Sequence, residues 1–323
     1  MNMFHLSQKP GATVVKSLGG LHRMADWDGP IITDSGGFQA FSLIHQNPKL
    51  GQITDRHLSF ETGAHSKRYI LTPEKSIRLQ LQMGADGLFC LDECTHVDAG
   101  EQAQVQAVKR TIAWARRCKD EFLRVIEQQK TTADRRPLLF GVVQGGASFE
   151  LRRECAEALL EIGFDGFGFG GWPLDAEGNL LAEMLQYTRK LIPSQFSLHA
   201  LGVGDPRNIA ACAAMGYALF DSSMPTRDAR HGRLYTFGSG DVDLLSPGGE
   251  WLKYVYLGDK KHLKNPQPLE SGCDADCCTR FSLGYLHHLF RCQDPSFQRL
   301  ATIHNLRFMT RLTSLLRADP RLS

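Results

Sequence analysis

The sequence lacks any apolar run that approaches the roughly 20 residues needed for a membrane-spanning helix. Its first residues, MNMFHLSQKPG, show neither a basic segment followed by an apolar core nor an Arg-rich amphipathic pattern, so no export or transit signal is visible. It also lacks internal repeats and low-complexity segments. These absences exclude membrane-spanning, exported and repeat-built classes, and they predict a soluble cytoplasmic protein without a membrane partner.

The sequence also has little net charge, only +2 over 323 residues. The charge is unevenly distributed, because residues 251–323 contain 11 Lys and Arg against 6 Asp and Glu, while residues 1–250 contain 26 against 29. The basic end is a candidate surface for phosphate groups. A solvated helical tail would have the same composition, so charge alone leaves both interpretations open.

Short apolar runs that end in glycine or polar residues alternate with helical patterns, one of which covers residues 98–128. Two helical patterns open with a capping side chain before a proline, at Thr72-Pro73 and Asp205-Pro206. Polar side chains at the carboxyl end of every run favour a closed barrel over an open sheet, so we predict an α/β fold, a TIM (β/α)8-type barrel. The runs occupy residues 30–37, 87–93, 137–146, 166–171, 197–204 and 218–225.

Nine cysteines are present, and five lie in separate core-like segments, which indicates reduced thiols rather than a disulfide framework. Three others crowd together near the carboxyl end, ahead of a histidine, and thiolates with an imidazole are the ligands of a closed structural zinc site. The histidines at 287–288 are competing ligands in a helical pattern. The zinc candidates are Cys273, Cys277, Cys278 and His304.

The organisation changes after Phe237, where the alternation stops and a stretch punctuated by glycine and proline runs to Glu270. Two helical patterns follow, at residues 279–290 and 296–316. We therefore predict two domains. They are a catalytic barrel over residues 1–265 and a zinc-binding subdomain with the carboxyl-terminal helices over residues 266–323.

Two aspartates occupy strand ends in unusual settings, Asp34 in TDSGGFQ and Asp221 in FDSSMPTR. A pair of carboxylates at a barrel mouth is the equipment of retaining glycosyl transfer, in which one attacks the anomeric carbon and the other moves protons. The glycines at 36–37 would let backbone approach a flat ligand, and Phe38 offers a stacking face. Either aspartate alone is more readily a turn or cap residue, but their joint occurrence favours catalysis.

Further polar groups follow three other strand ends and suit the edge of a purine. A carboxylate can accept hydrogen bonds from N1–H and the exocyclic amine of guanine, while an amide and a backbone N–H can donate to O6. Gln144 taken alone is more readily a structural residue. The candidates are Asp92 and Cys94 in CLDECT, Gln144 in VVQGG and Gly171 in FGGW.

Two glycine-rich segments suggest nucleotide sites less strongly. GFGFGG at 166–171 fits the dinucleotide-binding pattern, but that pattern should open a helix at once, whereas here Trp172-Pro173 follows and the helix is expected to begin near Asp175. LGVGDP at 201–206 could cradle a phosphate at a helix start, or it could be a tight turn from strand to helix.

Read together, these segments resemble the tRNA-guanine transglycosylase family, which includes the queuine and archaeosine tRNA-ribosyltransferases, over almost the whole chain. The segments GGLHRMADWDGPIITDSGGFQAFSL, LTPEKSIRLQLQMGADGLFCLDECT, FGVVQGG, LGVGDP, FDSSMPTRDARHG and YLHHL occur in the order that the family shows. The resemblance implies a pentosyltransferase that replaces a guanine in tRNA with a 7-deazaguanine of the queuine or preQ type.

The resemblance also implies roles for individual residues. Asp221 would attack C1′ of the target guanosine and form a covalent ribosyl intermediate, and Asp34 would help guanine leave. A structural zinc subdomain and a homodimer, or a heterodimer with a related subunit, are implied as well. Phe38 and Leu201 would sandwich the base, Asp92, Gln144 and Gly171 would read its edge, and Arg227 and Arg230 would lie near the nucleic-acid backbone.

The sequence departs from the family pattern in three places. The family normally has several dozen residues before the segment matching Asn2 to Leu6, so we expect either a later start than the native one or a shortened member with an incomplete first strand. Alignment with the family's zinc motif puts Cys273, Cys278 and His304 on ligand positions, but this chain has Ala275 where the family has a further cysteine. Cys277 could substitute for it, and we still expect bound zinc. WPLDAE at 172–177 replaces a segment that contacts the 7-substituent, which leaves the incoming base undecided.

Three alternatives remain open. The acceptor could be DNA instead of tRNA, because both present the same guanine edge. The chain could be a non-catalytic nucleic-acid-binding partner subunit, although an idle barrel would not need two desolvated carboxylates. An ordinary glycoside hydrolase is weaker still, because the site is built around a flat purine.

Overall fold

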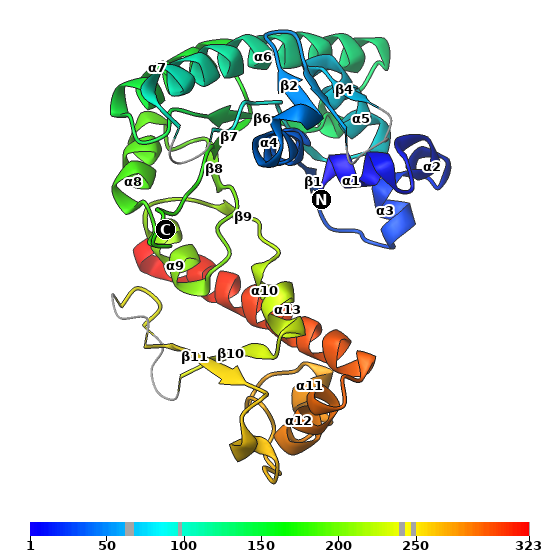
Figure 1. Cartoon of the computed structure of the whole chain (residues 1–323), viewed down its shortest axis with the longest axis vertical. Helices are drawn as coiled ribbons and strands as arrows, with labels where there is room; N and C mark the ends of the chain where they lie inside the picture. Colours follow the sequence, from blue (N-terminus) through cyan, green and yellow to red (C-terminus); the bar gives the residue numbers. More distant parts are fainter. Residues whose placement is uncertain (62–67, 96–98, 239–242, 247–249, 323) are drawn as a thin grey trace. The chain divides into compact units, whose positions relative to one another are not determined.

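The computed structural model describes residues 1–61, 68–95, 99–238, 243–246 and 250–322. The chain divides into two compact units, Met1–His199 and Ala200–Ser323, called here the amino-terminal and carboxyl-terminal units (Figure 1). Among the described residues, no helix is both long and apolar enough to cross a membrane.

The amino-terminal unit is built on parallel strands at the positions of the predicted apolar runs. Register pairs Ile32 with Gly87, Gly87 with Leu138, and Phe140 with Gly166. This confirms the α/β class and the parallel sheet. The strands, in spatial order, are β1 (Ile32–Thr33), β5 (Gly87–Phe89), β6 (Leu138–Val143), β7 (Gly166–Phe169) and β8 (Ser197–Ala200).

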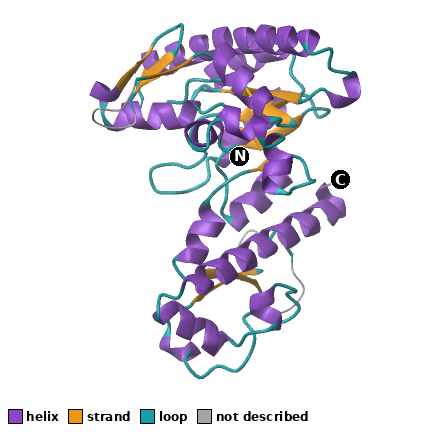
Figure 2. Ribbon diagram, turned by 90° about the vertical axis from the view of Figure 1, so that its right-hand side faces the viewer, coloured by secondary structure: helices purple, strands orange, loops and turns teal. Residues whose placement is uncertain are grey.

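Amphipathic helices cover this sheet, as Figure 2 shows for the helices around the strands. Their apolar faces bury large side chains such as Trp114 and Phe122, both fully inaccessible, and burial of apolar area is the main stabilising term. The predicted cap at Thr72 is confirmed, because its side chain accepts a hydrogen bond from Lys75 N–H at 3.1 Å. The helices are α5 (Pro73–Met83), α6 (Glu101–Gln128), α7 (Phe149–Ile162) and α8 (Ala182–Leu191), with the 3-10 turn η2 (Ala133–Arg135).

Two helix starts differ from expectation. The helix expected from residue 98 begins at Glu101, and Asp98 itself lies outside the described residues. The helix expected near Asp175 begins at Ala182, so that prediction is wrong. The reason is a tight loop, in which Asp175 accepts from the backbone N–H of Asn179 at 2.7 Å and Leu174 bridges to Leu180.

Several short elements had no counterpart in the predicted pattern. An antiparallel sheet of three-residue strands is inserted between β1 and β5, with Leu58 facing both Ile53 and Leu71 in its register. The three-residue strands and six-residue helices contain too few residues to display a period. The elements are α1 (Met3–Gln8), α2 (Ala12–Ser17), α3 (Gly20–Ala25), α4 (Gly37–Gln46), η1 (Pro48–Leu50), β2 (Gly51–Ile53), β3 (Leu58–Phe60) and β4 (Tyr69–Leu71).

The carboxyl-terminal unit begins with the last predicted β/α segment and continues into a hairpin and helices. The predicted cap at Asp205 is confirmed, because its Oδ1 accepts from the N–H groups of Arg207 and Asn208. The expected helix at 279–290 is interrupted, since Ser282 caps a new start. The elements are α9 (Pro206–Ala214), β9 (Leu219–Phe220), α10 (Met224–Arg230), β10 (Arg233–Phe237), β11 (Leu252–Tyr256), η3 (Lys260–His262), α11 (Asp276–Thr279), α12 (Leu283–Arg291), α13 (Pro295–Ala318) and η4 (Pro320–Leu322).

The boundary between the compact units, after residue 199, lies before the predicted domain boundary after residue 265. The long helix α13 explains this position, because it packs against α9, α10 and β10 as well as against α11 and α12. The barrel-type segment at 200–237 and the cysteine-rich segment therefore share one compact unit. The functional division into 1–265 and 266–323 stays a prediction.

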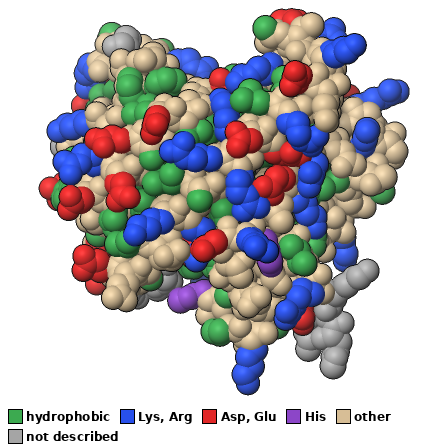
Figure 3. All heavy atoms as spheres, turned by 90° about the horizontal axis from the view of Figure 1, so that it is seen from above, with side chains coloured by type: hydrophobic (Ala, Val, Ile, Leu, Met, Phe, Trp, Pro, Cys, Tyr) green, Lys and Arg blue, Asp and Glu red, His purple; other side chains and the backbone are tan. Residues whose placement is uncertain are grey.

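The helical surface of the amino-terminal unit intersperses charges of both signs, in agreement with the small net charge of the chain. On the face shown in Figure 3, Lys and Arg side chains alternate with Asp and Glu. Ion pairs on α6 and α7 include Arg124 with Glu121 at 2.6 Å and Arg116 with Glu161 at 3.7 Å. Both partners of the Arg116–Glu161 pair are exposed, and such pairs contribute little to stability, whereas Glu121 is buried.

Candidate active site and metal centre

Asp34 directly follows β1, and three donors fix its carboxylate. Oδ1 accepts from the backbone N–H groups of Gly36 at 3.0 Å and Met3 at 3.1 Å, and Oδ2 accepts from Asn2 Nδ2 at 2.8 Å. Gly36 has a φ of +76°, and a Cβ there would lie 2.9 Å from Met3 Cε, so a side chain would disturb this arrangement. The carboxylate is thus held in one orientation at the end of the strand.

Phe38 lies in the first turn of α4 with 47% of its surface exposed, as a stacking platform requires. Its ring meets that of Trp172 edge to face, with the centroids 5.8 Å apart, and Trp172 is also exposed. Trp172 was not among the predicted site residues, although its place directly after Gly171 was a usable signal. The two rings form one aromatic surface beside the strand ends.

Asp92 and Gln144 follow the ends of β5 and β6 and contact each other. Gln144 Nε2 donates to Asp92 Oδ2 at 2.7 Å, and Gln144 Oε1 is buried without a hydrogen-bond partner among the described residues. Burial raises the pKa of Asp92 to about 6; the hydrogen bond from Gln144 opposes the rise, and the charges of Glu93 and Asp34 add to it. The structure therefore brings together two predicted base-reading groups, and Gln144 Oε1 can still accept a hydrogen bond.

Cys94 and Gly171 lie beside this pair. Burial raises the pKa of the Cys94 thiol, while a hydrogen bond from the Gly171 backbone opposes the rise. Gly171 has a φ of +87°, which favours glycine. Cys94 is therefore a neutral thiol in this environment, and its neighbour Glu93 is paired with Arg110.

In the carboxyl-terminal unit, Asp221 directly follows β9 and its side chain is exposed. Its Oδ1 accepts from the backbone N–H of Gly202 at 3.0 Å. Leu201, which precedes this glycine, is half-buried. A Cβ on Gly204 would lie 2.2 Å from Ser222 Cβ, so only glycine permits the two turns to approach. The LGVGDP segment is thus a tight turn whose N–H group is used by Asp221.

Helix α10 follows Asp221 and presents Arg227 and Arg230 as exposed side chains. Asp228, between them, points inward and accepts from Arg233 Nε at 2.8 Å and from the hydroxyl of Tyr235. Arg227 and Arg230 therefore lie on the exposed side of α10, and Asp228 connects the buried side of that helix to β10.

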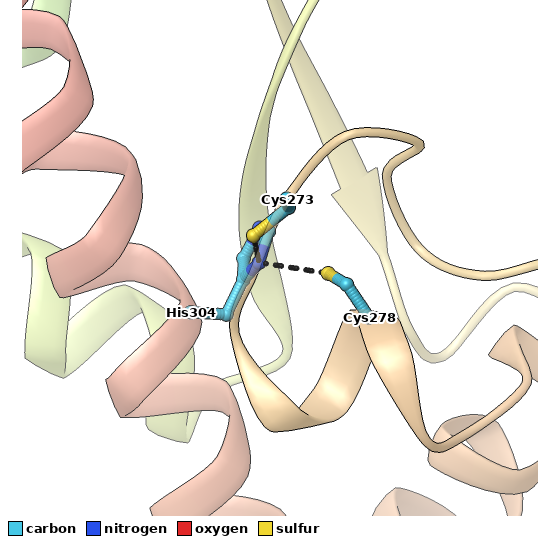
Figure 4. Close-up of side chains that lie close together, drawn as sticks. All are labelled: Cys273, Cys278 and His304. Atoms are coloured by element: carbon cyan, nitrogen blue, oxygen red, sulfur yellow. Dashed lines mark hydrogen bonds between the residues drawn. The ribbon is translucent and has the colours of Figure 1, made fainter.

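The candidate metal centre lies in the carboxyl-terminal unit. Cys273 Sγ, Cys278 Sγ and His304 Nδ1 all lie within 4.8 Å of one another, and all three residues are buried. Figure 4 shows both sulfur atoms near the imidazole, with Cys278 on α11 and His304 on α13. The Sγ to Nδ1 distances are 3.7 Å for Cys273 and 3.4 Å for Cys278. Tetrahedral zinc implies about 3.6 Å between such ligands, so this group could hold the metal.

The surroundings of His304 are also those of a metal ligand. Its Nε2–H donates to the carbonyl of Tyr235 at 2.7 Å, which leaves Nδ1 as the acceptor. The adjacent Asn305 accepts from Tyr235 N–H at 3.1 Å and donates to the carbonyl of Pro225 at 2.9 Å. Through these bonds, the histidine end of the metal centre is tied to β10 and to the start of α10.

The other proposed ligands lie outside this group. Cys277 Sγ is 3.8 Å from Cys278 Sγ but is not within 4.8 Å of all three ligand atoms, because adjacent residues on a helical turn point in different directions. His287 instead contacts the carbonyl of Leu257 at 2.5 Å, and His288 lies beside Cys292. Cys277 as the fourth ligand stays a prediction.

Comparison with known proteins gives a consistent result. Residues 1–319 match the family described as "Queuine tRNA-ribosyltransferase". Among similar proteins with that name, the one from Aromatoleum aromaticum is 38% identical over 317 residues, covering 98% of this chain and 79% of that protein. The one from Psychrobacter sp. is 35% identical over 311 residues, covering 96% of this chain and 76% of that protein. The one from Actinobacillus pleuropneumoniae is 36% identical over 316 residues, covering 98% and 76%.

Proposed function

The chain belongs to the queuine tRNA-ribosyltransferase family, and from that premise we propose that it exchanges a guanine in tRNA through a covalent intermediate on Asp221. The family has a TIM-barrel fold, and its members are pentosyltransferases that act on tRNA and guanine-type bases. Because the match extends over residues 1–319, this chain is a base-exchange transglycosylase. What is proposed here is how its residues perform the exchange.

In the first half-reaction, a carboxylate oxygen of Asp221 attacks C1′ of the target nucleoside. The bond from C1′ to N9 breaks, its electron pair goes to the departing guanine, and a proton from Asp34 neutralises that base. In the second half-reaction, the carboxylate of Asp34 takes the proton from N9 of the incoming base. N9 then attacks C1′ and Asp221 leaves as a carboxylate, so the enzyme is regenerated.

The observation that carries this proposal is that Asp34 and Asp221 each directly follow a strand of the α/β fold and are oriented by backbone N–H groups. Carboxylates at the carboxyl ends of barrel strands are where this fold carries its chemistry. Asp221 is exposed and can reach a macromolecular substrate, as nucleophilic attack on a tRNA ribose requires.

Recognition of the base falls to residues at or near the strand ends. Asp92 in its ionised form accepts from N1–H and the 2-amino group of guanine, while the Gln144 amide and the Gly171 N–H donate to O6. Gln144 Nε2 carries two N–H groups, so it can donate one to Asp92 Oδ2 and the other to O6. Phe38 and Leu201 cover the faces of the ring, and Arg227 and Arg230 contact the phosphate backbone.

We propose zinc as the metal, held by Cys273, Cys278 and His304 with Cys277 as the fourth ligand. Two thiolates and an imidazole whose other nitrogen is already engaged form a soft donor set typical of structural zinc. When bound, the ion would join α11 to α13. Its contribution is structural, and no step of the exchange passes through it.

A homodimer, or a heterodimer with a related subunit, and a cytoplasmic location also belong to the proposal. The support for both is the family resemblance and the tRNA substrate. The incoming 7-deazaguanine stays open between queuine and preQ-type bases, because the WPLDAE segment departs from the family pattern.

The test is incorporation of labelled guanine into either total tRNA or duplex DNA, with wild-type chain, Asp221→Ala and the control Asp259→Asn. Asp259 is a partly exposed surface aspartate whose Oδ2 lies 3.0 Å from Lys261 Nζ. Label in tRNA with wild type and the control, but not with Asp221→Ala, is the expected result. Label in DNA alone would change the proposed substrate from tRNA to DNA. Label in neither tRNA nor DNA, with folded protein, would refute the exchange.

A further inference from the structure

Arg152, on α7, is an unusual residue because only 1% of its side chain surface is exposed. A guanidinium keeps its charge under all ordinary conditions, and burying a charge is costly unless polar groups replace its water shell. Sequence reasoning gave this residue no role. The backbone carbonyls that it contacts indicate its role.

Each guanidinium nitrogen of Arg152 donates to a backbone carbonyl. Nε donates to Gly146 at 2.9 Å, Nη1 to Val143 at 3.1 Å and Nη2 to Gly170 at 3.1 Å. The guanidinium carbon also lies 3.9 Å from the centroid of the Phe169 ring. The planar fork of arginine matches three divergent acceptors, whereas the single ammonium of lysine does not.

These carbonyls flank the proposed base-reading groups. Val143 and Gly146 enclose Gln144 at the end of β6, and Gly170 precedes Gly171 at the end of β7. The carbonyl of Gly170 and the N–H of Gly171 belong to one planar peptide group and point in opposite directions. Arg152, by holding that carbonyl, therefore fixes the plane of this peptide and directs the Gly171 N–H away from itself.

The turns beside these carbonyls contain glycines, which explains why the carbonyls need to be held in place. Gly145 has a φ of +142°, and a Cβ there would lie 2.6 Å from the backbone nitrogen of Arg152. Gly171 has a φ of +87°. Glycine turns are conformationally permissive, so without an external clamp their peptide planes would rotate easily.

We propose that Arg152 is a positioning residue for recognition of the O6 edge of the base. It joins the ends of β6 and β7 and so sets the separation and direction of the Gln144 amide and the Gly171 N–H. This inference rests on the proposed function, because O6 is the group that these two donors would read. The three carbonyls that Arg152 holds flank Gln144 and Gly171, whereas Asp92, which would read the 2-amino edge, follows a different strand, β5.

The experiment compares wild type with Arg152→Lys and with the control Arg153→Lys. Arg153 is the next residue on α7, is exposed, and lies 3.5 Å from Glu150. The measurements are KM for guanine, KM for tRNA and inhibition constants for 6-thioguanine and hypoxanthine. 6-Thioguanine alters only the O6 position, and hypoxanthine lacks only the 2-amino group.

Arg152→Lys should raise the guanine KM by about tenfold, the scale of one hydrogen bond to the base. The preference for guanine over 6-thioguanine should shrink by a similar factor, while the preference over hypoxanthine, the tRNA KM and the control variant stay unchanged. Arg152→Ala with and without millimolar guanidinium provides a second readout, in which the added ion should restore discrimination at O6.

Unchanged discrimination in Arg152→Lys, or equal loss at both edges together with a raised tRNA KM, would overturn the proposal. Failure of guanidinium to restore discrimination at O6 would also count against it. Absence of guanine exchange in the wild-type chain would be a failure of the proposed function itself, and so would be recognised before any variant is compared.

Discussion

The two compact units fix their proposed functional groups in different ways. In the amino-terminal unit, Asp92 and Gln144 are bonded to each other and the adjoining backbone is clamped by the buried Arg152. In the carboxyl-terminal unit, Asp221 is exposed and accepts from a backbone N–H in a glycine turn. Reading a base requires desolvated polar groups in a rigid frame, whereas attack on a ribose requires an accessible carboxylate. Recognition and attack thus have different structural demands.

The units also differ in what stabilises them. The amino-terminal unit buries large aromatic side chains between its sheet and helices, among them Trp114, Phe122 and Phe167. The core of the carboxyl-terminal unit includes Cys273, Cys277 and Cys278 together with leucines of β10 and α12. Because this core contains candidate metal ligands, a bound metal would contribute part of its stability.

The largest expected effect is on the nucleophile. Asp221→Asn should lower kcat by about 10⁴-fold or more, because an amide cannot form the ester to C1′. The measurement is single-turnover exchange of labelled guanine, with Asp259→Asn as the matched control. Retention of more than a few per cent of activity would show that attack does not depend on this carboxylate, and the contrast between the units would disappear.

Removal of the metal should affect one unit and spare the other. We expect about one zinc per chain, and we expect its chelation to cost several kcal/mol of folding free energy in the carboxyl-terminal unit. Hydrogen exchange should show lost protection in α11 to α13 and unchanged protection in α6 and α7. Cys278→Ser should reproduce this effect, and the exposed Cys292 provides the control Cys292→Ser. Stoichiometric zinc in Cys278→Ser, or no zinc in wild type, would contradict the proposed site.

The pH dependence of base binding should report on Asp92, whose pKa burial raises to about 6. The ionised form accepts from guanine, so the guanine KM should fall as pH rises through about 6 and then level off. Asp92→Asn should abolish this dependence, whereas the exposed-residue control Glu157→Gln should keep it. A guanine KM that is flat from pH 5 to pH 7 in wild type would rule out this role.

The same shift has a consequence for stability. The pKa of Asp92 is higher in the folded chain than in the unfolded chain, where an aspartate titrates near 4, so the folded state binds its proton more tightly. The free energy of unfolding of wild type relative to Asp92→Asn should therefore fall as pH rises from about 4 to about 6 and stay constant above. A rise over that interval would contradict the buried environment.

The smallest expected effect concerns the link between the metal centre and α10. Tyr235→Phe removes the hydroxyl that donates to buried Asp228 and should lower the free energy of unfolding by about 1–2 kcal/mol. It should also raise the tRNA KM modestly and leave the guanine KM unchanged, since α10 carries Arg227 and Arg230. Urea denaturation and steady-state kinetics measure both, with Tyr256→Phe as an exposed control.

Much of this architecture could be predicted from the sequence, because six apolar runs with polar ends identify six strands and the residues that follow them. The caps at Thr72 and Asp205 were predictable because each is a capping side chain directly before a proline, a signal that depends only on neighbouring residues. Other features depend on contacts distant in sequence. Nothing in the helical pattern around Arg152 indicates that its side chain reaches the carbonyls of Val143 and Gly170.

The candidate metal ligands show the same limit. Spacing alone identified four candidates, and only the family motif placed Cys278 rather than the adjacent Cys277 on a ligand position, because the direction of each side chain depends on how the short helix α11 is oriented. The LGVGDP segment allowed two interpretations; the structure shows a turn in which Gly202 N–H donates to Asp221, and the phosphate interpretation stays open. Short elements such as α1 to α3 escaped prediction because tertiary contacts, rather than periodicity, define them.

The most direct test of the account is a search for the covalent intermediate. The chain is incubated with tRNA in the absence of a competing base, quenched in denaturant, digested and examined by mass spectrometry. We predict a ribosyl adduct on the peptide that contains Asp221, formed by wild type and lost when guanine is added. An adduct on another residue, or active enzyme with no adduct under conditions that trap esters, would contradict the central claim that Asp221 is the nucleophile.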